Sequence, residues 1–198
     1  MSLVIVAFTR EFGVLACDGR VTDSDNNAIY EDFKKYHQVN DHVVVGFAGQ
    51  ANRCQIMIDY LDEQLASQEK SQISVVDVYK HLQLPVVQSQ LLNTDVNMKF
   101  LILGKNKNSQ VRCFSVDYHG DYDACPVKMA PLGDLGFASA YHGAYGDYNE
   151  IIASSIAEAR SRIKSPIEAV IEGLTKAIQE VATFDESVNG HVSTVVIQ

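Results

Sequence analysis

Residues 13–22 read GVLACDGRVT and residues 43–51 read VVVGFAGQA, and these two stretches carry most of the information about the fold. Each contains a short run of apolar and β-branched residues, which predicts a buried strand. The first run ends at Asp18, and the second ends at Gly49, just before a helical pattern begins at Ala51. We therefore expect two core strands, one ending on a carboxylate and the other on a glycine turn into a helix.

The rest of the chain adds strands and helices in a simple order. Strands are predicted at residues 3–8, 35–39, 42–48, 99–104, 110–118, 122–131 and 191–197. Helices are predicted from Ala51, from Ser74 as far as Pro85, over residues 148–163, and from Ser165, where Ser-Pro-Ile-Glu is a helix-start pattern. Two helical blocks between mainly antiparallel strands favour an α+β layered sandwich, formed as one domain by residues 1–198.

Composition excludes several classes of function. The net charge of -9 argues against nucleic acid or an anionic membrane surface as the main partner, because both require a basic face. No apolar run approaches the roughly 20 residues that span a bilayer. The four cysteines form no CxxC pair and the six histidines form no ligand motif, so we expect neither a metal nor a cofactor. Scattered cysteines in apolar surroundings predict a cytoplasmic protein.

In their order and spacing these motifs resemble the proteasome β-subunit superfamily, which includes bacterial proteasome-like N-terminal-nucleophile hydrolases. Residues 13–22 are similar to the family's VVLAADSRAT segment, and Lys34-Lys35 with residues 43–51 is similar to its KK…GxAGxxAD segment. Residues 101–104, residues 131–133 and the position of Asp185 after the last helix add support. The resemblance covers nearly the whole chain. It implies a four-layer αββα sandwich, in which two stacked, mainly antiparallel sheets lie between helical layers.

The resemblance also implies an active site at the N-terminus. The family's nucleophile is the first residue of the mature chain, which corresponds to Ser2 after removal of Met1. A free α-amine has a pKa near about 8, so it can accept the proton of the hydroxyl on its own residue. Lys35 matches the family's Lys and Asp18 the carboxylate that holds it, while the backbone N–H of Gly49 matches the donor to the oxyanion.

Further positions are implied with less direct matches. Asp185 matches a supporting Asp, and Ser187 could supply a supporting hydroxyl. However, Asp134 stands where the family has a supporting Ser, and the family's Ser-Gly-Gly becomes residues 187–190 (SVNG). Three residues match positions of the specificity pocket in the family: Val21, Phe33 and Phe47.

Each assignment has a purely structural alternative. Asp18 could form a turn or pair with Arg20, Lys35 could be solvated beside Lys34, and Gly49 could serve only the tight connection to the helix. The leading hypothesis is a peptidase that cleaves peptides or unfolded chains inside a ring or other homo-oligomeric assembly, with dependence on an ATP-driven unfoldase left open. The alternatives are a catalytically inactive structural subunit and an N-terminal-nucleophile amidase that acts on a small amide.

Overall fold

The computed structural model describes residues 2–23, 27–83, 98–118, 123–127, 135–142 and 148–198. Several sequence features lie outside these residues, namely Met1, Pro85, both ends of the predicted strand at 122–131, the motif at residues 131–133 and Asp134. The strands are β1 (Ser2–Phe8), β2 (Gly13–Asp18), β3 (Val21–Thr22), β4 (Ala28–Tyr30), β5 (Tyr36–Asn40), β6 (Val43–Gly49), β7 (Met98–Lys105), β8 (Val111–Asp117), β9 (Asp123–Pro126), β10 (Gly136–His142) and β11 (Val192–Ile197). The helices are α1 (Ala51–Leu65), the short 3-10 helix η1 (Lys70–Gln72), α2 (Val75–Leu82), α4 (Asn149–Arg162) and α5 (Pro166–Val181).

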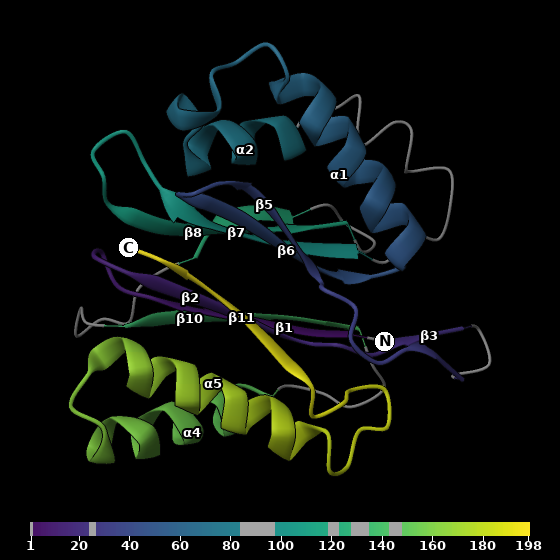
Figure 1. Cartoon of the computed structure of the whole chain (residues 1–198), viewed down its shortest axis with the longest axis vertical. Helices are drawn as coiled ribbons and strands as arrows, with labels where there is room; N and C mark the ends of the chain where they lie inside the picture. The colour runs from purple at the N-terminus through teal and green to yellow at the C-terminus, as the bar shows by residue number, and fades with distance from the viewer. Residues whose placement is uncertain (1, 24–26, 84–97, 119–122, 128–134, 143–147) are drawn as a thin grey trace.

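The elements form four layers (Figure 1). One sheet has the strand order β10-β1-β2-β11 and is covered by α4 and α5, and the other has the order β5-β6-β7-β8-β9 and is covered by α1 and α2. All neighbouring strands described in these two sheets pair antiparallel. The predicted αββα sandwich is therefore confirmed. None of the helices in the described ranges is long and apolar enough to cross a membrane.

The central strands are buried on both faces, which explains their continuous apolar sequences. In β1, Leu3 and Ile5 pack in the cluster beneath α4 and α5, whereas Val4 and Val6 pack in the cluster between the two sheets. Successive side chains of a strand point to opposite faces, so a strand between two cores needs apolar residues at every position.

Two helix starts follow from the sequence. The Ser165 hydroxyl accepts a hydrogen bond from the amide of Glu168 at 3.4 Å, at the start of α5. At the start of α2, the amide and hydroxyl of Ser74 donate to the Asp77 carboxylate at 3.1 and 2.7 Å. Such caps satisfy polar groups that the first helical turn leaves without partners.

Sequence reasoning missed β10, the β3–β4 pair and η1. The strand β10 pairs with β1 along its whole length, from Ser2 opposite His142 to Phe8 opposite Gly136. Its sequence GFASAYH is rich in small residues with weak strand preference, so it gave no clear strand signal. The strands β3 and β4 are too short to show a periodicity.

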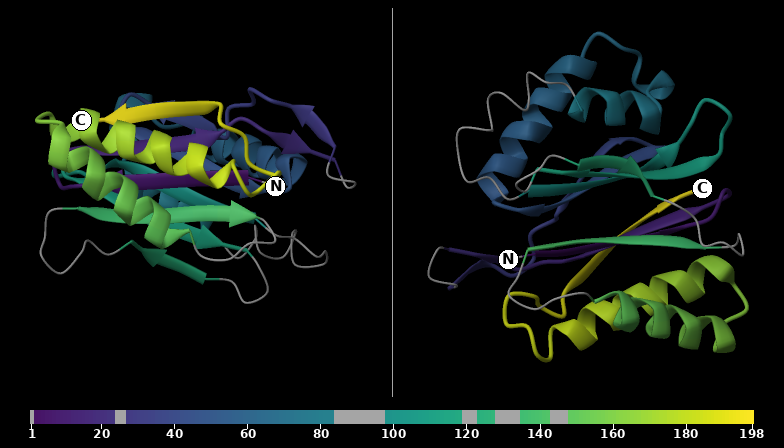
Figure 2. Two further views of the ribbon diagram at one scale, coloured as in Figure 1. Left: turned by 90° about the horizontal axis from the view of Figure 1, so that it is seen from below. Right: turned by 180° about the vertical axis from the view of Figure 1, so that it is seen from behind.

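The ends of four strands lie side by side in the sheet β10-β1-β2-β11, and we call this end of the sheet the site edge. Ser2 begins β1 opposite His142 at the end of β10. Asp18 ends β2 opposite Val192, which begins β11. Residues 182–191, which connect α5 to β11, therefore lead directly to the site edge. The label N in Figures 1 and 2 marks the same place.

Candidate active site

Lys35 and Asp18 form a buried ion pair that joins the two sheets. The Lys35 Nζ lies 2.6 Å from Oδ1 of Asp18, and the two side chains are 2% and 0% exposed. Asp18 ends β2 of one sheet, and Lys35 lies directly before β5 of the other. The neighbouring Lys34 is exposed. A buried charge without a partner is costly, so each member of this pair depends on the other.

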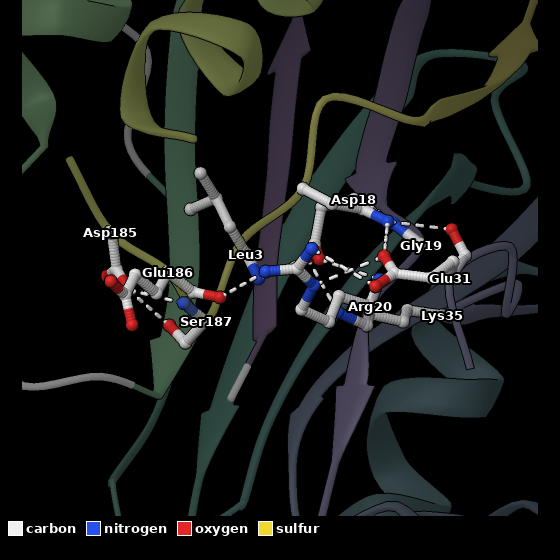
Figure 3. A network of polar contacts seen from close by, with 10 residues as sticks. Leu3, Asp18, Gly19, Arg20, Glu31, Lys35, Asp185, Glu186 and Ser187 are labelled. Atoms are coloured by element: carbon white, nitrogen blue, oxygen red, sulfur yellow. Dashed lines mark hydrogen bonds and ion pairs between the residues drawn. The ribbon is translucent and has the colours of Figure 1, made fainter. Parts of the chain in front are cut away.

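The Asp18 carboxylate is fixed by two backbone donors as well as by Lys35 (Figure 3). The amide of Leu3 donates to Oδ1 at 2.7 Å, and the amide of Arg20 donates to Oδ2 at 3.0 Å. Asp18 therefore both bonds the turn at Arg20 and pairs with Lys35. The Arg20 guanidinium instead pairs with Glu31, with 3.0 Å between Nη2 and Oε1.

Burial shifts the pKa of Lys35 and of the neighbouring Cys17. Burial lowers the pKa of the Lys35 ammonium, although the adjacent Asp18 carboxylate acts in the opposite direction. An ammonium with a lowered pKa releases a proton more readily. Burial raises the pKa of the nearby Cys17 thiol to about 11, so this thiol stays protonated at neutral pH and does not compete as a nucleophile.

Gly49 forms the turn between β6 and α1. It is paired with Met98 in β7 and has a φ of 123°. This is a backbone conformation that favours glycine because residues with a Cβ rarely adopt it. The structural role of Gly49 is thus visible in the backbone, and its role as an oxyanion donor stays a prediction.

A second buried carboxylate lies in residues 182–191. The Tyr148 hydroxyl donates to Oδ2 of Asp185 at 2.6 Å. The other oxygen, Oδ1, accepts hydrogen bonds from the amide of Ser187 at 2.9 Å and from its hydroxyl. Burial acts to raise the pKa of Asp185, but the hydrogen bonds from Ser187 and Tyr148 outweigh it and hold this pKa below its ordinary value. Asp185 is therefore ionised at neutral pH.

Asn189 links residues 182–191 to the backbone of Gly19 and Glu31. Its Oδ1 accepts from the amide of Gly19 at 2.9 Å, and its Nδ2 donates to the carbonyl of Glu31 at 2.7 Å. A Cβ on Gly19 would lie 2.4 Å from that carbonyl oxygen, so only glycine fits there. The Arg20 guanidinium adds a hydrogen bond to the carbonyl of Glu186 (Figure 3).

The three predicted pocket residues are neighbours, but they differ in exposure. Val21 pairs with Tyr30 across β3 and β4, and Tyr30 lies 6.1 Å from Phe33 between ring centroids. The rings of Phe33 and Phe47 meet edge-on at 6.4 Å. Phe47 is only 5% exposed and belongs to the core beneath α1 and α2, whereas Val21 and Phe33 are half-buried. Val21 and Phe33 are thus better placed to meet a ligand.

Ser2 begins β1 at the site edge, where both carboxylate networks lie. The structure describes the backbone of Ser2 and not its side chain, so its role as nucleophile stays a prediction. The next residue, Leu3, contacts Asp18 through its amide and shares a core cluster with Tyr148 and Val188. Leu3, which follows Ser2, thus lies between the Asp185 network and the Lys35 pair (Figure 3).

Sequence reasoning missed Tyr148 and Asn189 as members of this region. In the sequence, Tyr148 was the first residue of a predicted helix and one of several loosely clustered tyrosines, and Asn189 was a departure from the family's Ser-Gly-Gly. No local pattern reports a contact across 37 or 170 residues. Buried tyrosines usually bond their hydroxyl, which was the one available signal for Tyr148.

Comparisons with known proteins agree with the geometry. The family model described as "Proteasome subunit" matches residues 4–197. Among solved structures, eukaryotic HslV from Trypanosoma brucei is similar in fold, with a TM-score of 0.60, 15% sequence identity and 99% of each chain covered. A comparison with curated proteins found no match. Because the family model spans almost the whole chain, this chain belongs to the proteasome subunit family.

Proposed function

We propose that this chain is a proteasome-type peptidase in which Ser2, freed by removal of Met1, is the N-terminal nucleophile. Membership of the proteasome subunit family supports a peptidase of this type in general terms. The observation that carries the finer proposal is the buried pair of Lys35 and Asp18, located at the site edge, where Ser2 begins β1. A lysine with no partner would be exposed to solvent, as Lys34 is, whereas Lys35 is buried against a carboxylate.

The proposed chemistry uses groups that lie around the site edge. The free amine of Ser2 takes the proton of its own hydroxyl, and the oxygen attacks the carbonyl carbon of the peptide bond. The Lys35 ammonium lowers the pKa of the amine and stabilises developing negative charge. The amide of Gly49 donates to the oxyanion, and the protonated amine then gives its proton to the leaving nitrogen. Water releases the acyl group by the same steps.

Exposed apolar residues support assembly into a homo-oligomer. The hairpin of β3 and β4 projects from the body of the molecule (Figure 2) and carries Ile29 and Tyr30, which are 54% and 56% exposed. Apolar and aromatic side chains of this kind are enriched at the centres of protein interfaces. We propose a ring that encloses the sites and limits them to peptides and unfolded chains. The free, buried cysteines Cys17 and Cys54 support a reducing, cytoplasmic location.

Hydrolysis by matched serine variants tests the proposal. The purified protein is incubated with a permanently unfolded protein and with short fluorogenic peptides, and its assembly is measured by light scattering. Ser2→Ala should abolish cleavage and Ser2→Thr should retain it, because only the hydroxyl is required. Ser161→Ala, on an exposed position of α4, should behave as the wild type.

Other results would favour the alternative functions. Equal, negligible cleavage by the wild type and Ser2→Ala within an intact multi-subunit particle would support a structural subunit. Cleavage of small amides without cleavage of peptides would support an amidase. A monomer in light scattering would contradict the ring.

A further inference from the structure

Tyr148 connects the start of α4 to the carboxylate of Asp185. Its hydroxyl donates to Oδ2 at 2.6 Å, and the two residues are 4% and 3% exposed. The ring is held by edge-on packing against Tyr141, with centroids 5.3 Å apart, and by Phe184 at 6.2 Å. A hydroxyl on such a fixed ring determines the orientation of the carboxylate that it contacts.

The orientation of this carboxylate in turn fixes the hydroxyl of Ser187. With Oδ2 occupied by Tyr148, Oδ1 accepts both the amide and the hydroxyl of Ser187. A serine hydroxyl has a single proton, and here this proton is given to Asp185. The Ser187 oxygen can therefore act only as an acceptor toward any other group. Because the carboxylate is ionised at neutral pH, this arrangement persists under working conditions.

An acceptor of this kind suits the proposed base. A neutral α-amine can take a proton only through its lone pair, so its N–H bonds should point to acceptors and its lone pair to the hydroxyl. Residues 182–191 lie at the site edge with Ser2, since β11 begins opposite Asp18. Val188, the residue after Ser187, packs in one cluster with Leu3 and Tyr148. The Ser187 hydroxyl thus lies on the same side of the molecule as Leu3, the residue after Ser2 (Figure 3).

We propose that Tyr148 is a positioning residue for the reaction. It holds Asp185 so that the Ser187 oxygen accepts an N–H of the Ser2 amine and turns the amine lone pair toward the hydroxyl. This inference rests on the proposed function. The alternative is that Tyr148 merely satisfies a buried carboxylate and affects stability alone.

A double-mutant cycle on kcat separates these two roles. Tyr148→Phe keeps the ring and removes one donor, Ser187→Ala removes the acceptor, and the double variant removes both. Tyr118→Phe is the matched control, because its buried hydroxyl donates to the carbonyl of Leu82 in the opposite helical layer. Each protein is assayed for peptide hydrolysis well below its melting temperature, and kcat and KM are measured separately.

We expect Tyr148→Phe to lower kcat by about 10- to 100-fold with KM nearly unchanged, the scale of a small misplacement of a reacting group. The double variant should lose little more than Ser187→Ala, because both act through one network. A wild-type kcat in Tyr148→Phe, or fully multiplicative losses in the double variant, would overturn the inference while leaving the proposed function intact. An inert wild type would instead overturn the proposed function, and the positioning role with it.

Discussion

The ammonium of Lys35 and the carboxylate of Asp18 lie 2.6 Å apart, and both are sealed from solvent at the junction of the two sheets. Lys35→Ala leaves Asp18 as a buried charge without its cation. We expect the free energy of unfolding to fall by about 3–5 kcal/mol and peptide hydrolysis to be lost. Urea denaturation measures the first effect and a peptide assay the second.

The neighbouring lysine provides the control for this experiment. Lys34 is exposed, so Lys34→Ala should change the free energy of unfolding by no more than about 0.5 kcal/mol. Equal stability of the two variants would show that the pair contributes nothing to folding.

The pKa of Asp185 predicts a specific dependence of stability on pH. The pKa is held below its ordinary value of 3.8 in the folded state, so Asp185 contributes stability that is full above the unfolded pKa and is lost as the pH falls through the folded pKa. On acidification from about pH 6 to about pH 3, the melting temperature of the wild type should fall more steeply than that of Asp185→Asn. At neutral pH, Asp185→Asn should be the less stable protein.

An adjacent variant controls for the general effect of acid. Glu186 is exposed next to Asp185, so Glu186→Gln should follow the wild-type curve throughout. Parallel curves for Asp185→Asn and the wild type would show that the carboxylate has no special stabilisation in the folded protein.

Asn189 should limit local unfolding of the segment around Gly19. Asn189→Ala removes the acceptor for the Gly19 amide and the donor to the Glu31 carbonyl. We expect a loss of about 1–3 kcal/mol in the free energy of unfolding. Hydrogen exchange of the Gly19 amide should accelerate. The amide of Thr9, bonded to the carbonyl of Phe12 at the opposite end of β1, should exchange as in the wild type.

Alanine at position 49 should strain the backbone, whereas alanine at position 190 should not. Gly49 has a φ of 123°, whereas a Cβ on Gly190 would meet only a side-chain atom of Gln179 at 3.9 Å. We expect Gly49→Ala to cost about 1–3 kcal/mol of stability. Alanine retains the backbone N–H but is strained at this φ, so if the amide serves the oxyanion its displacement should also lower kcat by about 10²-fold in the protein that remains folded. An unchanged kcat in folded Gly49→Ala would show that catalysis does not depend on this backbone conformation.

The sequence was sufficient for the layers and for the positions of Asp18, Lys35 and Gly49 relative to the strands. Continuous apolar runs such as that of β1 indicated strands buried on both faces. Asp18, Lys35 and Gly49 could be placed because each lies at the end of such a strand or beside one, and their catalytic roles stay predictions. The rest depended on long-range contacts. β10 has small residues whose pairing with β1 decides their conformation, and the contacts of Tyr148 and Asn189 are made across distant parts of the chain.

The most direct test of the central claim is the intact mass of the purified protein before and after treatment with a peptide epoxyketone, which reacts with a hydroxyl and a free amine on one residue. We predict loss of Met1 and a single adduct in the wild type, and no adduct in Ser2→Ala. A protein that retains Met1 and gains no mass, or an equal adduct on Ser2→Ala, would contradict Ser2 as the N-terminal nucleophile.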